Sequence, residues 1–234
     1  MISIPELTSF ISLIYFLRDN KELLISTRII GKYNWDWWYY WGSWVPNGGY
    51  TPTYEYMEMF PMADGTPFDF NKTVADNTVF FEENDYNRPT RDPRLYETIL
   101  VNGAKWSGRS VELWVGGREN ANSTSTETGQ YATGFGLYKF YKEGKGSLAN
   151  NYLEWPYLRM SEMYLIYAEA QARLDGGSTS DATAVGYIKA LRTRAGLSCP
   201  ATIDTDFILK ERACELFWEG HRRTDLIRYG LFHS

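Results

Sequence analysis

The chain has few of the residues on which most metal and redox sites depend. Its 234 residues include only two cysteines, Cys199 and Cys214, and two histidines, His221 and His233. The cysteines are too few for a disulfide scaffold, and their spacing fits no zinc or thiol redox motif. The histidines have no ligand-like spacing to acidic or thiol side chains. We therefore expect neither a metal nor a cofactor, while the sequence leaves the pairing of the cysteines open.

An excess of positive charge is also absent. Lysine and arginine total 24 against 29 aspartate and glutamate residues, which gives a net charge of -5 and a pI near 5.2. Binding to a phosphate backbone needs a concentrated surplus of basic residues, so we expect no nucleic acid partner. The glycine pairs at 116–117 and 176–177 lack the lysine and the serine or threonine of a phosphate-binding loop.

No apolar run near the N-terminus is long enough to cross a bilayer, which takes about 20 residues. Apolar residues within 10–17 predict a short helix over residues 6–19 instead. Pro5 and Glu6 interrupt the approach to this helix, and neither the basic region nor the small-residue cleavage site of a secretory signal is present. We expect that nothing in this chain by itself directs export.

Aromatic residues, by contrast, are frequent, at 17% of the chain. Eight of them, five being tryptophan, fall within residues 33–44, which read YNWDWWYYWGSW. One interpretation is an aromatic packing patch in the core. Tryptophan is used sparingly in cores because each indole N–H needs a partner, and here the indoles stand beside small polar residues and before a turn at 46–49. The second interpretation is a stacking platform for a sugar, whose ring has apolar faces and polar edges.

The sugar interpretation assigns roles to individual side chains. An indole that covers the apolar face of a pyranose leaves the hydroxyls at the ring edge to polar groups. Alternate residues of an extended segment point to opposite sides, so part of the rings would anchor the core. The expected stackers are Trp37, Trp38, Tyr40 and Trp41, with Asn34 and Asp36 as hydroxyl partners.

Local patterns predict an irregular first part with a few short elements. We expect a buried strand over residues 22–30, helical turns over 53–60, and loops over 116–130 and 144–151. From Asp92 we expect a proline-assisted turn that continues as an extended or strand-like run to a hairpin signal at Asn102-Gly103.

The last third is predicted to be helical. We expect helices over residues 158–174, from the cap Asp181 to Gly196, over 205–219, and after a cap at Thr224. The first of these has two apolar stripes, one through Leu165, Ala168 and Ala172 and the other through Tyr164, Tyr167 and Leu174, so it should pack on more than one face.

Charged residues are dense inside these helices. They allow an anion or catalytic site, but their signs balance and unpaired buried charge is costly, which favours an interhelical ion-pair network. The set comprises Arg159, Glu162, Arg192, Arg194, Glu211, Arg212, Glu215, Glu219, Arg222 and Asp225.

Several ordered segments together resemble a known family. They are PTYEYMEMFPMADGTP (52–67), NRPTRDPRLYETILVNG (87–103), YLRMSEMYLIYAEAQARL (157–174), LRTRAGL (191–197) and LKERACELFWEGHRRTDLIRYG (209–230). In this order and spacing they are similar to the C-terminal signature of the SusD/RagB family of Bacteroidetes outer-membrane nutrient-binding lipoproteins.

The resemblance implies a mainly α fold, with tetratricopeptide-like helix pairs in the C-terminal third, an irregular loop-rich portion and a few short strands. We expect one SusD/RagB-like C-terminal domain over residues 1–234, with a ligand-binding portion over 1–151 and a helical portion over 152–234. The length and the absence of the family's acylated cysteine suggest a C-terminal portion or a truncated member.

The resemblance also implies a function. Family members lie on the cell surface over a SusC-like TonB-dependent transporter, and many capture oligosaccharides without catalysis. It implies that this chain binds an oligosaccharide or another nutrient such as a peptide at the outer membrane. Membrane association would come through a lipid anchor that this chain does not contain.

Two other classes of function remain open. A glycoside hydrolase would also combine an aromatic cleft with two carboxylates, for which Asp36, Glu55 and Glu58 are the candidates. A scaffold whose helix pairs bind only protein would instead keep the aromatic segment in its core.

Overall fold

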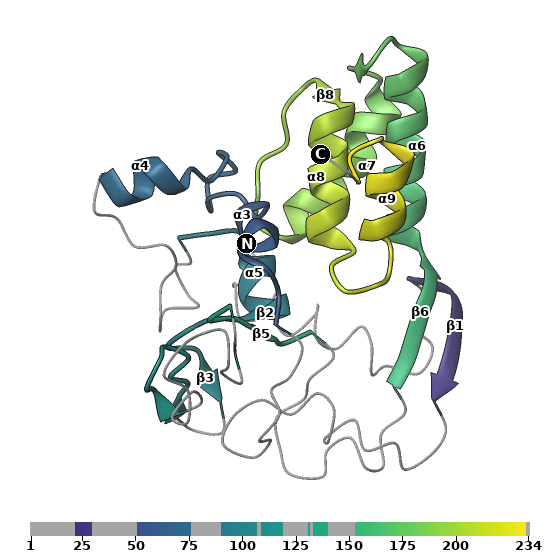
Figure 1. Cartoon of the computed structure of the whole chain (residues 1–234). Coiled ribbons are helices and arrows are strands. Elements are labelled where there is room, and N and C mark those ends of the chain that lie inside the picture. Colours follow the sequence, from purple (N-terminus) through teal and green to yellow (C-terminus); the bar gives the residue numbers. More distant parts are fainter. Residues whose placement is uncertain are drawn as a thin grey trace.

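The computed structural model describes residues 22–29, 51–75, 90–106, 109–118, 131, 133–139 and 153–232. Within these ranges the protein is mainly helical with short two-stranded sheets, which confirms the predicted fold class. The helices of the last third lie together, and the earlier helices and short strands lie beside and below them (Figure 1). The aromatic segment 33–44 and the predicted helix 6–19 lie outside the described residues.

A long antiparallel pair joins the two portions of the chain. Strand β1 (Leu23–Ile29) confirms the strand predicted over 22–30, and it pairs with β6 (Leu153–Arg159). Thr27 lies opposite Trp155 in this register. The pairing continues to the first helix residue, because the Met160 N–H donates to the Glu22 carbonyl at 2.8 Å. The start of the chain's described part is thus fixed to the helical portion.

The first helices are short. Helix α3 (Tyr54–Glu58) begins at the cap Thr53, and α4 (Phe70–Ala75) follows it. The turn predicted at Asp92 begins helix α5 (Pro93–Thr98), so the prediction that an extended run follows the turn directly is wrong for these residues. The Asp92 carboxylate accepts the Arg94 N–H at 2.9 Å, and Pro93 occupies the first turn, where its missing N–H costs nothing.

Three further strand pairs are only two residues long on each side. They are β2 (Ile99–Leu100) with β5 (Gly136–Leu137), β3 (Lys105–Trp106) with β4 (Arg109–Ser110), and β7 (Ser178–Thr179) with β8 (Ile203–Asp204). The hairpin signal at Asn102-Gly103 is misplaced, because β3 and β4 pair with each other beyond it. Asn102 instead supports a turn, with its side-chain oxygen accepting the Leu113 N–H at 3.0 Å.

The helices of the last third differ from prediction mainly at their ends. They are α6 (Met160–Leu174), α7 (Ala182–Arg194), α8 (Thr205–Glu215) and α9 (Arg222–Arg228). The Asp181 cap is confirmed, since its carboxylate accepts the Thr183 and Ala184 N–H groups at 3.0 and 2.8 Å. The Thr224 cap is wrong, because α9 begins before that residue, after His221.

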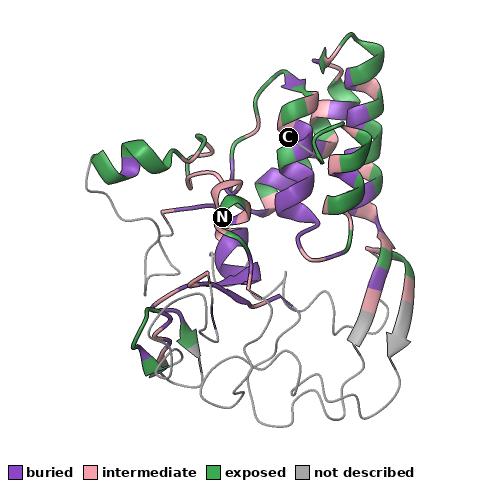
Figure 2. Cartoon of the chain, viewed as in Figure 1, coloured by how far each residue is buried: buried purple, intermediate pink, exposed green. Residues whose placement is uncertain are grey.

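Helix α6 buries one of its two apolar stripes against α7 and α8. Leu165, Ala168 and Ala172 are fully buried, as expected. The other stripe is only partly covered among the described residues, with Tyr167 exposed at 43% and Leu174 at 80%. Figure 2 shows both exposed and buried residues along α6. Tyr164 of this second stripe nonetheless packs against the helical core and stacks on the Tyr187 ring of α7, with 4.4 Å between the ring centroids.

Two apolar cores meet at the end of α8. The helical core includes Leu165, Ile188 and Leu216, whereas the other core includes Met57, Leu95 and Ile99. Cys214 in the last turn of α8 and Phe217 just after the helix pack in the second core. The last helical turn of α8 and the residues just after it therefore contribute side chains to both cores.

Candidate functional site

The turn after α8 borders a cleft of about 450 Å³, which we call the aromatic cleft. Its described lining residues are Thr51, Pro52, Thr53, Tyr56, Trp155, Leu216, Phe217, Trp218, Gly220, Arg222 and Arg223. The lining comes from the segment that leads into α3, from β6, from the turn and from α9. Each of these elements is separately anchored to the protein.

Two tryptophans belong to this lining. Trp155 on β6 and Trp218 in the turn are both half-buried, so each indole keeps part of its surface accessible. Trp218 has a φ of 60°, in the left-handed region that costs a non-glycine residue about 1–2 kcal/mol. Helix α8 has already ended at Glu215, and not at the predicted Glu219. The unfavourable backbone angle places an indole at the cleft.

Tyr56 and Phe217 connect the cleft to the core beneath it. The Tyr56 hydroxyl donates to the Ala213 carbonyl at 2.8 Å, and its ring meets Phe217 edge-on at 4.9 Å between centroids. Burial raises the pKa of Tyr56, so its hydroxyl remains protonated as a donor. The position of this side of the cleft is thus tied to the end of α8.

Glu219 holds the other end of the Trp218 turn. Its carboxylate accepts from Arg159 at 2.8 and 2.9 Å and from the Lys139 ammonium at 2.7 Å. Lys139 also donates to the Phe217 carbonyl at 2.6 Å. Burial raises the pKa of Glu219, but Arg159 and Lys139 outweigh it and keep the pKa below its ordinary value. Contacts to both backbone and side chain therefore fix the turn that carries Trp218.

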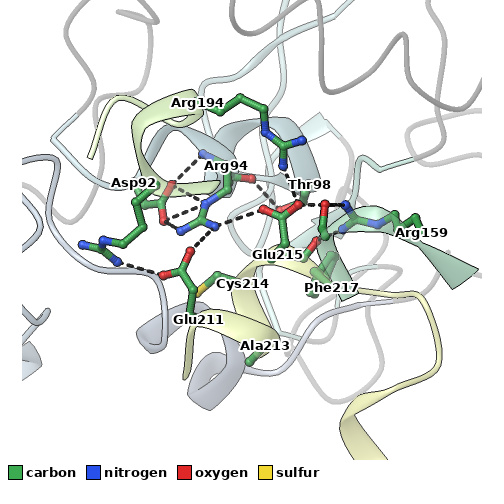
Figure 3. Close-up of polar contacts among 12 residues, drawn as sticks. Asp92, Arg94, Thr98, Arg159, Arg194, Glu211, Ala213, Cys214, Glu215 and Phe217 are labelled. Carbon is green, nitrogen blue, oxygen red and sulfur yellow. Dashed lines mark hydrogen bonds and ion pairs between the residues drawn. The ribbon is translucent and has the colours of Figure 1, made fainter. Parts of the chain in front are cut away.

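Glu215 is the centre of the same buried network. Arg159 donates to it at 2.8 Å, Arg94 at 3.2 Å, and Arg194 forms a third ion pair with it (Figure 3). Burial alone would raise the pKa of Glu215, but these guanidinium groups hold it well below its ordinary value. Figure 3 also shows Glu211, which pairs with Arg94 at 2.6 Å. The expected interhelical ion-pair network is confirmed for most of its predicted members, whereas Arg222 forms no ion pair among the described residues.

A second branch of ion pairs positions α9. Asp225 accepts from Arg212 of α8 at 3.1 Å and from Arg228 at 2.8 Å. Arg228 also pairs with Glu169 of α6. Because these pairs connect three helices, they hold the start of α9, and with it Arg222 and Arg223, at the edge of the cleft.

A second cleft, of about 470 Å³, lies on the side of α8 that carries Phe207. Its described lining includes Glu55, Glu58, Asp204, Asp206 and Glu211, so it is rich in carboxylates. We call it the acidic cleft. Two of the carboxylates considered for a hydrolase, Glu55 and Glu58, therefore lie here, while the described lining of the aromatic cleft contains no aspartate or glutamate.

All six residues predicted to bind a sugar lie outside the described residues. They are Asn34, Asp36, Trp37, Trp38, Tyr40 and Trp41. The chain on either side of them is nonetheless placed. The segment 30–50 follows β1, in which Thr27 pairs with Trp155, and it precedes Thr51, which lines the aromatic cleft. Described residues on both sides of the predicted platform in the sequence thus pair with or line the aromatic cleft.

Trp155 and Trp218 were not among the binding residues predicted from the sequence. For Trp218 the sequence did contain a signal, because a large aromatic residue directly before Glu219-Gly220 stands where a helix is expected to end. Arg94 and Lys139 were also missed from the network, because they come from the irregular portion and pair with partners more than 70 residues away.

The sequence also raised the questions of cysteine pairing, metal binding and membrane-spanning helices. Cys199 and Cys214 are both free thiols, which answers the question of their pairing. The part of the chain that the structure describes contains no group of three or more histidine, cysteine or acidic residues arranged to hold a metal. None of its helices has both the length and the apolar content to span a membrane.

A model of the SusD family matches residues 25–234, which is most of the chain. The chain belongs to the SusD family. This finding confirms the resemblance seen in the ordered sequence segments. Over 78 residues the chain is also 38% identical to the starch-binding protein SusD of Bacteroides thetaiotaomicron, a stretch that covers 33% of this chain and 13% of that protein.

Solved structures of SusD-like proteins share the fold. A SusD-like protein from Bacteroides fragilis superposes with a TM-score of 0.69 at 20% identity, covering 99% of this chain and 48% of that chain. A SusD-like carbohydrate binding protein from the same species also gives 0.69, at 22% identity, over 97% of this chain and 45% of its own. The chain thus spans about half the length of the SusD-like structures that it matches.

Proposed function

We propose that this protein binds oligosaccharides without catalysis, using the aromatic cleft together with the tryptophan-rich segment 33–44. The observation that supports this most directly is the pair Trp155 and Trp218, which line one cleft in a chain of the SusD family. A sugar ring presents an apolar face to an indole and polar hydroxyls at its edge. The named relatives, a starch-binding protein and a carbohydrate binding protein, support the same class of ligand.

Binding without hydrolysis is supported by the chemistry of the lining. Glycoside hydrolysis takes two carboxyl groups about 5 to 10 Å apart across the scissile bond. Within the described lining of the aromatic cleft, aspartate and glutamate are absent. A sugar held there meets guanidinium, hydroxyl and indole groups, which can bind and orient it.

The proposed setting is the outer surface of a bacterial outer membrane. We propose that the captured oligosaccharide passes to a SusC-like TonB-dependent transporter, as the family resemblance implies. In this role the rigid ion-pair network would keep the cleft in one shape through cycles of capture and release. A lipid anchor outside this chain would hold the protein at the membrane.

Affinity electrophoresis against a panel of polysaccharides tests the binding. Trp155→Ala should weaken retention by the bound polysaccharide, with a loss of about 1 kcal/mol or more. Trp114→Ala is the matched control, because that indole is exposed and lies outside the described lining of the aromatic cleft. Trp37→Ala and Trp41→Ala test the predicted platform. Equal retention of Trp155→Ala and the native protein would contradict a role for Trp155.

An assay for new reducing ends separates binding from hydrolysis. The protein is incubated with each polysaccharide that it retains, and the reducing ends are counted over time. We expect no increase above the substrate alone. A steady increase that is lost in Asp36→Asn, Glu55→Gln or Glu58→Gln would show a glycoside hydrolase instead.

A further inference from the structure

The aromatic cleft differs in charge from the rest of the protein. Its only charged lining residues among those described are Arg222 and Arg223, whereas the whole chain has a net charge of -5. The acidic cleft shows the opposite balance, with five carboxylates against Arg192 and Lys210. A positive site on an acidic protein favours an anionic ligand over a neutral one.

The Arg222 guanidinium has a hydrogen-bond donor that is unsatisfied among the described residues. Its Nη1 atom is buried and has no hydrogen-bond partner among the described residues. Leaving a buried donor unsatisfied costs about 1–3 kcal/mol, and more when the group is charged. Arg159, in contrast, donates to two carboxylates and to a backbone carbonyl. Arg222 also lines the aromatic cleft, where a shift of its side chain would let the guanidinium donate to a ligand oxygen.

Arg223 adds a second guanidinium on the open side of the cleft. It is exposed, and its guanidinium carbon lies 5.5 Å from the centre of the Phe232 ring. A stacked guanidinium keeps its N–H groups at the edge, where they are free to donate in pairs to a carboxylate. The pairs of Asp225 with Arg212 and Arg228 hold the helix that carries both cleft arginines.

We propose that the aromatic cleft selects acidic oligosaccharides, in which a sugar ring carries a carboxylate. This inference rests on the proposed function and names the class of sugar. The carboxylate of a hexuronate extends from the edge of the pyranose ring. A ring stacked on Trp155 or Trp218 would direct that group outward from the indole, toward donors at the cleft edge. Guanidinium groups are the side chains best suited to bind a carboxylate in pairs of hydrogen bonds.

Titration calorimetry with matched oligosaccharides tests this selection. The probes are oligogalacturonate and its fully methyl-esterified form, which has the same sugar backbone without the charge. We expect the acid to bind about ten-fold more tightly than the ester, the size of one charge-assisted hydrogen bond of about 1.4 kcal/mol. Equal affinities for acid and ester would overturn the inference.

Arg223→Gln tests the guanidinium without disturbing the core, since this side chain is exposed. It should reduce the affinity for oligogalacturonate about three- to ten-fold and leave the ester unchanged. Lys189→Gln, an exposed change on α7 that removes the same charge, should leave both affinities unchanged. Arg222→Gln should show a larger loss for the acid, with far-ultraviolet circular dichroism recorded to establish that the variant folds.

Two further arms separate this inference from the proposed function. Trp155→Ala should weaken the affinity for the acid and for the ester alike. If the ester binds in a way that depends on Trp155 and the acid binds no more tightly, the proposed function stands and the preference for acidic sugars is rejected. Dextran sulfate tests for general attraction of polyanions. Binding of dextran sulfate that matches oligogalacturonate and is insensitive to Trp155→Ala would also reject the inference. Absence of binding to every glycan would reject the proposed function itself.

Discussion

Arg159 and Glu219 form a two-bond ion pair inside the protein, with Nε 2.8 Å from one carboxylate oxygen and Nη2 2.9 Å from the other. Arg159 is the last residue of β6, the strand that carries Trp155, and Glu219 directly follows Trp218. The pair therefore joins the two segments that bring tryptophans to the cleft. This geometry makes the shape of the cleft dependent on buried charge.

Glu219→Gln should destabilise the protein strongly. The change leaves Arg159 and Lys139 buried with less compensating charge, and breaking such a pair costs about 3–5 kcal/mol. Urea unfolding followed by tryptophan fluorescence measures the loss. Asp206→Asn is the control, because it breaks the exposed pair with Lys210 and should cost no more than about 0.5 kcal/mol. Similar losses for the two variants would show that the buried pair is not special.

Acid should unfold the protein through the same network. The pKa values of Glu215 and Glu219 are lowered in the folded state, so the unfolded chain binds protons more readily as the pH falls. The stability from these carboxylates is present above the ordinary glutamate pKa of about 4.5 and is lost as the pH falls through the folded values. The urea midpoint should fall steadily from pH 5 to pH 3. A midpoint that stays constant over this range would contradict the assignment.

Glu97→Gln should stabilise the protein at neutral pH. Burial raises the pKa of Glu97 to about 8, so at pH 7 the folded state must hold a proton that the unfolded state releases. Glutamine removes this requirement, and the free energy of unfolding should rise by roughly 1–3 kcal/mol at pH 7. The gain should disappear near pH 4, where both states bind the proton. Glu55→Gln, at an exposed position, should show no such gain at either pH.

Trp218→Gly should be more stable than Trp218→Ala. Both changes delete the indole, but only glycine adopts a φ of 60° without steric cost, which favours it by about 1 kcal/mol. Thermal or urea unfolding of the two variants gives the difference directly. Both should lose sugar affinity to the same extent, because neither has a ring to stack. Higher stability of the alanine variant would mean that this turn relaxes out of the left-handed conformation.

The sequence predicted correctly those helices and strands that are determined by residues close together in the chain. The Asp181 cap and the strand at β1 follow from residues within a few positions. The helix at Pro93–Thr98 also had a local cause, the Asp92 cap with proline after it, but six residues give too little periodicity to distinguish it from an extended run. Helix ends were less well predicted where distant contacts decided them.

The end of α8 shows how distant contacts take over. Apolar periodicity continues through Phe217, so the sequence favours helix up to Glu219. In the folded protein Lys139 and Arg159 hold this stretch from 80 and 60 residues away, and the helix ends at Glu215. Propensity within the segment contains no information about such partners.

The sequence by itself determined the family, the helical last third and the balance of charges that must pair when buried. It also placed an aromatic platform at 33–44, which stays a prediction because those residues lie outside the described structure. Only the tertiary structure decided that Trp155 and Trp218 line one cleft with Arg222 and Arg223. The physical reason is that family segments and helix periodicity are properties of residues close together in the sequence. A cleft instead lies between elements that are far apart in the chain, and here buried ion pairs hold those elements together.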